Sequence, residues 1–93
     1  EVEFEWDQNK ADLNQKKHGV CFSEASTVFS DPLELTISDP DHSQDEFRFL
    51  SIGISDIGNL LLVSYTERQE NRVRIISARK ASKHEQKDYE QNH

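Results

Sequence analysis

Cysteine and long apolar segments are both scarce in this 93-residue chain. Its single cysteine, Cys21, excludes an internal disulfide and fits a reducing compartment. No apolar run approaches the roughly 18–20 residues that cross a bilayer, and no apolar h-region of a secretory signal is visible. We therefore expect one cytoplasmic domain over residues 1–93, without a membrane partner.

Repeats, linkers and low-complexity segments are also lacking, and only 33% of the residues are hydrophobic. A chain of this length buries about 60–65% of its unfolded surface, so its core must be modest. The apolar residues are concentrated in the segments "FRFLSIGI", "LLLVSYT" and "VRIISA". These segments indicate where the core lies.

The first third of the chain predicts one strand and two helices. Residues 2–6 alternate apolar and acidic side chains, which is typical of a half-buried strand. Asp7 and Gly19 have the residue types of an N-cap and a left-handed C-cap, so a helix is expected between them. Ser23 predicts the start of a second, short helix. Cys21 is interpreted as a buried, inert thiol.

The remainder predicts a meander of strands and a terminal helix. An edge-like strand, "LELTI", and a polar loop at residues 38–46 precede the segments "FRFLSIGI", "GNLLLVSYTER" and "NRVRIISA". Short turns between the last three predict antiparallel pairing. Ser82 and Glu85 have the spacing of a capping box that begins a helix. The expected fold is α+β: an antiparallel sheet of about four strands, with two N-terminal helices and a C-terminal helix on one face.

Positive charge is scarce overall but locally concentrated. Eighteen Asp and Glu outweigh 11 Lys and Arg, which gives a net charge of −7. Ten of the 11 bases fall in two places, the first predicted helix and residues 68–87. Because phosphate responds to the local field, a cationic cleft can bind it in an acidic protein.

The segment "RIISARKASKHE" places Arg79 and Lys80 where a strand passes into a helix. Exposed N–H groups at a helix start, next to an arginine fork, favour phosphate binding. The alternative is a structural pairing of Arg79 with an acid such as Glu46. Lys83 and Lys87 are interpreted as solvated partners of acids on the terminal helix.

Two other segments carry possible chemistry. In "YTER", Glu67 can accept a proton and Arg68 can stabilise a phosphorane, although a hairpin-end salt bridge explains both residues equally well. In "KKHG", Lys17 and His18 lie at a helix C-terminus, where capping by cations is the alternative to a chemical role. His42 lies in the polar loop without the ligand spacing of a metal site, so neither metal nor cofactor is expected.

These observations leave two classes open, an enzyme and a nucleic-acid-binding module. The order of four motifs, F-E-W-D, N-x-x-K-H-G, Y-T-x-R and R-I-I-S-A-R-x-A-S-x-x-E, resembles the BrnT family, which comprises toxins of bacterial type II toxin–antitoxin pairs. The resemblance runs from Phe4 to about Tyr89. It departs from the family pattern at Cys21, where a small polar residue is common.

The resemblance implies a RelE-like fold and a metal-independent ribonuclease that inhibits translation. It also implies a BrnA-type antitoxin with a DNA-binding part, which neutralises the toxin in a 2:2 heterotetramer and brings the toxin to operator DNA. The alternative is a non-catalytic module that acts as co-repressor within that complex. In either case the partners are RNA or the antitoxin, and no cofactor is implied.

The site residues predicted on this basis fall into two groups. The expected catalytic residues are Lys17, His18, Glu67, Arg68 and Arg79. The two arginines stabilise transition-state charge, His18 or Lys17 serves the leaving oxygen or the phosphate, and Glu67 is the offered general base. The expected RNA-binding residues are Lys10, Arg74 and Lys80.

Overall fold

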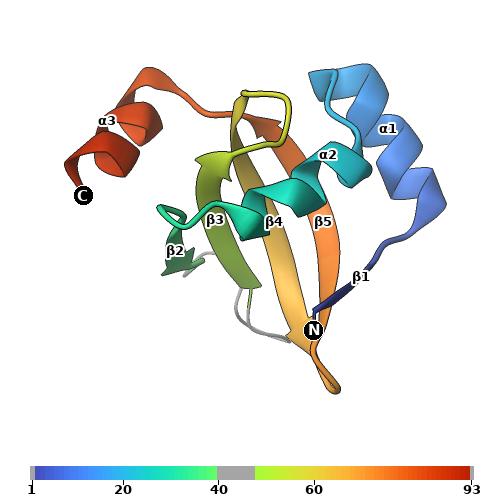
Figure 1. Ribbon diagram of the computed structural model, residues 1–93. Helices are drawn as coiled ribbons and strands as arrows, with labels where there is room; N and C mark the ends of the chain where they lie inside the picture. Colours follow the sequence, from blue (N-terminus) through green and yellow to red (C-terminus); the bar gives the residue numbers. More distant parts are fainter. Residues whose placement is uncertain (1, 40–47, 93) are drawn as a thin grey trace.

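The structure is a computed structural model that describes residues 2–39 and 48–92 (Figure 1). Within these ranges, one sheet is combined with three α-helices and a 3₁₀ helix. The elements are β1 (Glu3–Glu5), α1 (Gln8–His18), α2 (Phe22–Ser26), η1 (Thr27–Ser30), β2 (Leu35–Ser38), β3 (Arg48–Ile54), β4 (Leu60–Arg68), β5 (Arg72–Lys80) and α3 (Lys83–Gln91).

The sheet has the strand order β1-β5-β4-β3-β2. The β2–β5 meander is antiparallel, as predicted, and β2 is the edge strand expected from "LELTI". The predicted antiparallel sheet of about four strands is nevertheless wrong, because β1 joins the sheet parallel to β5 and makes it five-stranded and mixed. The Glu5–Arg74 pairing joins residues 69 positions apart, and no turn signal in the sequence announces such a contact.

One face of the sheet is covered by α1, α2 and η1. Figure 1 shows α2 in front of the strands and α1 to the right, beside β5. Alternate residues of β4, Leu61, Val63 and Tyr65, face these helices and join the larger core cluster. Ala25 and Val28 meet them from α2 and η1, and both are fully buried. Gly53 is required here, because an added Cβ would lie 2.8 Å from the Val28 side chain.

The other face of the sheet carries a smaller cluster, in which Tyr89 of α3 packs with Ile52 and Leu62. Leu62 lies between Leu61 and Val63 on β4, so its side chain points to the opposite face. The prediction of all helices on one face is therefore wrong. The capping box predicted where α3 begins, but only tertiary packing determines which face of the sheet α3 covers. Most of this second face has no helix over it in the described residues.

Helix α1 is held by its caps and by one buried amide. Asp7 accepts a hydrogen bond from Asn9 N at 3.2 Å, and Gly19 has a φ of 71°, so both predicted caps are confirmed. The buried Asn14 side chain donates to the carbonyls of Val20 and Ala78 and accepts from Ala78 N. These bonds tie α1 to β5 through polar contacts, since its apolar stripe is thin.

The start of α2 differs from the prediction. Cys21, not Ser23, is the N-cap, and its Sγ accepts from Glu24 N at 3.4 Å. The expected buried thiol is therefore exposed, because the capping position directs it to the helix end while the next residue, Phe22, fills the core. The predicted polar loop lies mostly outside the described residues, and so does His42. No helix in the described ranges has the length and apolarity needed to span a membrane.

Candidate phosphate-binding site on the open face of the sheet

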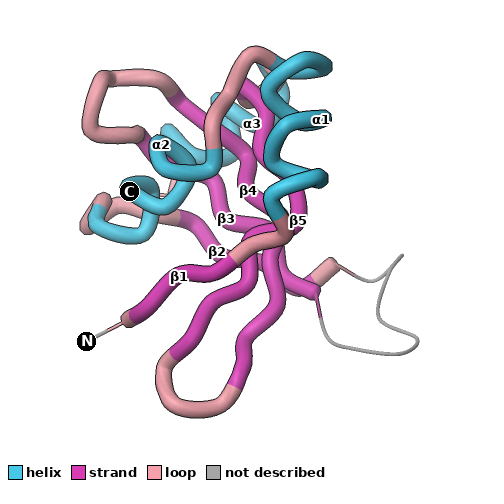
Figure 2. The backbone as a smooth tube through the Cα atoms, turned by 90° about the vertical axis from the view of Figure 1, so that its right-hand side faces the viewer, coloured by secondary structure: helices cyan, strands magenta, loops and turns pink. Residues whose placement is uncertain are grey.

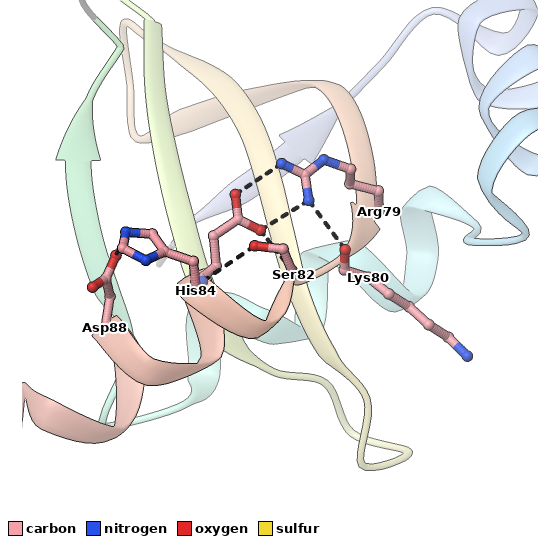
Figure 3. Close-up of polar contacts among 6 residues, drawn as sticks. Arg79, Lys80, Ser82, His84 and Asp88 are labelled. Carbon is pink, nitrogen blue, oxygen red and sulfur yellow. Dashed lines mark hydrogen bonds and ion pairs between the residues drawn. The ribbon is translucent and has the colours of Figure 1, made fainter.

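The corner between β5 and α3 is organised by Glu85. The carboxylate accepts from both terminal nitrogens of Arg79, at 2.8 Å each, and from Ser82 N at 2.8 Å (Figure 3). Ser82 Oγ accepts in turn from Glu85 N, which completes the predicted capping box. One carboxylate therefore begins the helix and fixes the arginine fork.

This pairing strongly favours the ionised form of Glu85. The hydrogen bonds from Arg79 are the main reason that the pKa of Glu85 falls to about 2, against the opposing effect of burial. The same contact raises the pKa of Arg79 above its ordinary value. Arg79 thus has the acidic partner that the structural alternative expected. That partner is Glu85, whereas Glu46 lies outside the described residues.

The pairing leaves part of the Arg79 fork available. Of its five N–H donors, two bind Glu85 and a third binds the Lys80 carbonyl at 3.2 Å. Two donors therefore remain for another acceptor. The Lys80 side chain points away from the guanidinium, as Figure 3 shows. The two neighbouring bases of the sequence motif consequently act on different sides of the strand.

A cavity of about 250 Å³, here called the corner cavity, lies on the open face of the sheet beside Arg79. His18 lines it from the end of α1, and Arg48 lines it from the start of β3. Its polar wall is completed by Asp39, Ser64 and Ser77, with Leu50, Leu62 and Ile76 as apolar lining. Residues from four separate elements thus bring two arginines, a histidine and two hydroxyls together.

Arg48 is a cationic lining residue that was not predicted from the sequence, and the polar residues Asp39, Ser64 and Ser77 were not predicted either. In "FRFLSIGI" Arg48 alternates with Phe49, so it shares a face with Leu50 and Ile52. Phe49 packs on the helix-covered core, which leaves Arg48 on the open face. The alternation was visible in the sequence, but nothing local indicated that this face would lie beside Arg79.

Glu67 and Arg68 lie elsewhere, at the β4–β5 turn, here called the hairpin end. Figure 2 shows this turn projecting away from the helices. The two residues line a separate cavity of about 530 Å³ together with Glu5, Gln69, Glu70 and Arg72. Ser64 of the corner cavity lies four positions along β4 from Arg68, roughly 13 Å at about 3.3 Å per residue, although Arg68 lies only two positions from Thr66, the partner of Arg48. The predicted catalytic residues therefore do not all converge.

Charges at the hairpin end are interleaved. Arg74 binds Glu5 at 3.0 Å, and Arg72 lies 3.7 Å from Glu5 and 3.3 Å from Glu70. The hydrogen bond from Arg74 is the main cause of the lowered pKa of Glu5. Strand β1 therefore neutralises arginines of β5 through Glu5.

The remaining predicted residues are dispersed. Lys10 and Lys17 are exposed on α1, and Lys17 does not line the corner cavity although its neighbour His18 does. Arg74 is half-buried on the open face of β5 and engaged by Glu5. In the described part of the chain, no group of three or more His, Cys, Asp or Glu residues is arranged to hold a metal ion.

The corner cavity can hold an anion by its guanidinium groups and can exchange a proton through His18. Its position on an open sheet face makes it reachable by an extended polymer. The fold and the site together define a small α+β domain with a cationic cavity suited to a phosphate-bearing ligand.

Comparison with known proteins shows the family to which this chain belongs. The family model described as "Ribonuclease toxin, BrnT, of type II toxin-antitoxin system" matches residues 6–85. The chain therefore belongs to the BrnT family of ribonuclease toxins, and membership implies an antitoxin partner.

A solved structure supports the fold. The chain is similar to the crystal structure of the Brucella abortus ribonuclease toxin BrnT, with a TM-score of 0.65 and 22% sequence identity. The match covers 89% of this chain and 100% of that one. Among curated proteins, none matches this chain.

Proposed function

We propose that this toxin is a metal-independent, RelE-like endoribonuclease that cuts RNA in the corner cavity and thereby inhibits translation. The observation that carries the proposal is the joint lining of one cavity by His18, Arg48 and Arg79 in a chain with a net charge of −7. Such a local cationic site binds a polyanion that the remainder of the protein repels.

In the proposed reaction, the RNA supplies its own nucleophile. The 2′-oxygen forms a bond to the adjacent phosphorus, and the bond from phosphorus to the 5′-oxygen breaks. One proton leaves the 2′-hydroxyl and another is delivered to the 5′-oxygen, so the products are a 2′,3′-cyclic phosphate and a 5′-hydroxyl. The two donors that Arg79 retains are suited to the charge that develops on the phosphorane oxygens.

Proton transfer falls to side chains of the same cavity. His18 is the group that we assign to the leaving oxygen. Asp39 is the lining carboxylate, whereas Glu67, the general base offered by the sequence, lies at the hairpin end. Comparison of Asp39→Asn with Glu67→Gln separates these two candidate bases. Only replacement of the residue that acts as the base should lower the cleavage rate, on the order of 10²-fold or more.

The proposal is tested by incubating total RNA with the purified protein in EDTA, with and without ribosomes. Mass spectrometry then identifies the new ends. Cyclic-phosphate and 5′-hydroxyl ends are the expected result. Cleavage that stops in EDTA and returns with added Mg²⁺ would contradict metal independence, and no cleavage under any of these conditions would contradict the enzymatic activity itself.

For its cellular setting, we propose that the toxin acts in the cytoplasm and is neutralised by a BrnA-type antitoxin in a 2:2 heterotetramer. Operator DNA is then reached only through the antitoxin. Mass measurement of the co-purified complex, followed by operator binding with and without the toxin, tests both statements.

A second candidate function is a non-catalytic module that acts as co-repressor within the antitoxin–DNA complex. The observation in its favour is the separation of Arg68 and Glu67 from Arg79 and His18. The two candidates differ in one outcome: the module would strengthen operator binding by the antitoxin while leaving RNA intact.

A further inference from the structure

Arg48 holds a distinctive place among the arginines of the sheet. Arg72, Arg74 and Arg79 each contact a carboxylate within 3.7 Å. By contrast, within residues 2–39 and 48–92, Arg48 makes no ion pair, and its buried Nε has no hydrogen-bond partner. A buried donor without an acceptor is costly, so an anionic ligand would be favoured there.

The neighbour of Arg48 across the strands has the same property. Arg48 pairs with Thr66 of β4, and both lie on the open face of the sheet. Thr66 Oγ1 is also buried without a partner in the described residues. Two paired residues, of which Arg48 lines the corner cavity, thus each have one buried polar atom without a hydrogen-bond partner in the described residues.

Arg48 and Arg79 line the corner cavity from different positions along the sheet. Arg79 pairs with Leu62 and Arg48 with Thr66, four residues further along β4. That offset is roughly 13 Å at about 3.3 Å per residue. Ser64 and Ser77, which pair with each other, lie between the two rows and present hydroxyls to the cavity. The arrangement suits a chain with more than one phosphate.

We propose that Arg48 is a substrate-binding residue that holds a backbone phosphate of single-stranded RNA, distinct from the phosphate beside Arg79. This inference rests on the proposed RNA substrate. Arg48 thereby fixes the position of the RNA strand across Ser64 and Ser77. Arg79, fixed by Glu85, serves the neighbouring phosphate at the helix corner.

Binding of an uncleavable RNA tests the inference apart from catalysis. The probe is a short 2′-O-methyl oligonucleotide, which lacks the nucleophile, titrated against the full chain over a range of salt concentrations. For single strands, each phosphate contact contributes about 0.7 to the slope of log K against log salt. Arg48→Ala is expected to lower that slope by about 0.7 and to weaken binding about tenfold at low salt.

Three variants control the experiment. Arg48→Lys keeps the charge and should retain most of the slope, while Arg48→Gln keeps a polar stem and should lose it. Arg72→Ala removes an arginine from the hairpin end and should leave the slope unchanged. Thermal melts verify that each variant is folded, and Arg48→Gln answers the question if Arg48→Ala is not.

The outcomes separate this inference from the proposed function. A wild-type slope in folded Arg48→Ala and Arg48→Gln overturns the inference, even if the wild-type enzyme cleaves RNA. A reduced slope in both variants supports the phosphate contact, even if no RNA is cleaved and the ribonuclease proposal fails. Equal slope losses in Arg72→Ala and Arg48→Ala would also overturn it, because the contact would then be a general charge effect.

Discussion

The corner cavity and the hairpin end contain the same kinds of residue but organise their charge differently. Two arginines face three glutamates in the lining of the hairpin end, and two arginines face one aspartate in that of the corner cavity. Glu85, which neutralises Arg79, does not line the corner cavity, because the capping box holds it at the start of α3. Both regions pair arginines with carboxylates. An arginine can meet a ligand where its carboxylate partner lies outside the cavity lining, and is neutralised where the partner lies within it.

The largest expected difference between the two regions concerns proton transfer. His18→Ala should lower RNA cleavage by about 10²- to 10⁴-fold, because the cavity loses its imidazole. His84→Ala is the matched control, since His84 is exposed on α3, where it lies 3.6 Å from Asp88, and does not line the corner cavity. Initial cleavage rates of the two variants give the comparison. Equal losses in both would show that the proton donor does not lie in the corner cavity.

A second difference concerns transition-state charge. Arg79→Ala should reduce cleavage by about 10²-fold, as is typical when a donor to a developing oxyanion is removed. Arg68→Ala should change it less than about threefold, because Arg68 lines the hairpin-end cavity and not the corner cavity. Single-turnover rates measured on folded variants test the pair. If Arg68→Ala were the more damaging change, the active site would have to be moved to the hairpin end.

The two regions should also differ in stability against acid. The pKa of Glu85 is about 2 in the folded protein and about 4.5 when unfolded. Because the folded value is depressed, the stabilisation is complete above about pH 4.5 and is lost as the pH falls towards 2. Glu85→Gln should therefore cost about 1–2 kcal/mol at pH 7 and little at pH 2. Urea unfolding at both pH values measures this, with Glu70→Gln as the exposed control.

The smallest expected effect lies in the hairpin turn. Glu70 and Asn71 both have positive φ values, 62° and 61°, in a conformation that is unfavourable for residues with a Cβ. Glu70→Gly should relieve part of this strain and raise the free energy of unfolding by up to about 1 kcal/mol, less what is lost with the exposed Arg72 contact. RNA cleavage should not change. A lower cleavage rate would indicate that the hairpin end takes part in the reaction.

Local features of this fold could be predicted from the sequence because short-range chemistry determines them. The caps of α1 at Asp7 and Gly19 and the capping box of Ser82 and Glu85 are set by residues within a few positions of each other. The start of α2 was not predicted correctly from local residue types, because the N-cap is the thiol of Cys21 and not the hydroxyl of Ser23.

Non-local features could not be predicted. The parallel pairing of β1 with β5 and the packing of α3 on the second face depend on contacts between distant segments. The same holds for the site. His18 and Arg79 were identified by their local settings, but their shared cavity, its separation from Arg68 and the presence of Arg48 follow only from strand register.

The place where RNA binds can be located residue by residue by nuclear magnetic resonance. Backbone amide shifts of ¹⁵N-labelled protein are followed while a 2′-O-methyl oligonucleotide is added. We expect the amide signals of His18, Ser64 and Ser77 to shift together, while those of Glu67–Arg72 remain unchanged. Shifts centred on Glu67–Arg72, with the corner cavity unaffected, would contradict this placement of the RNA site.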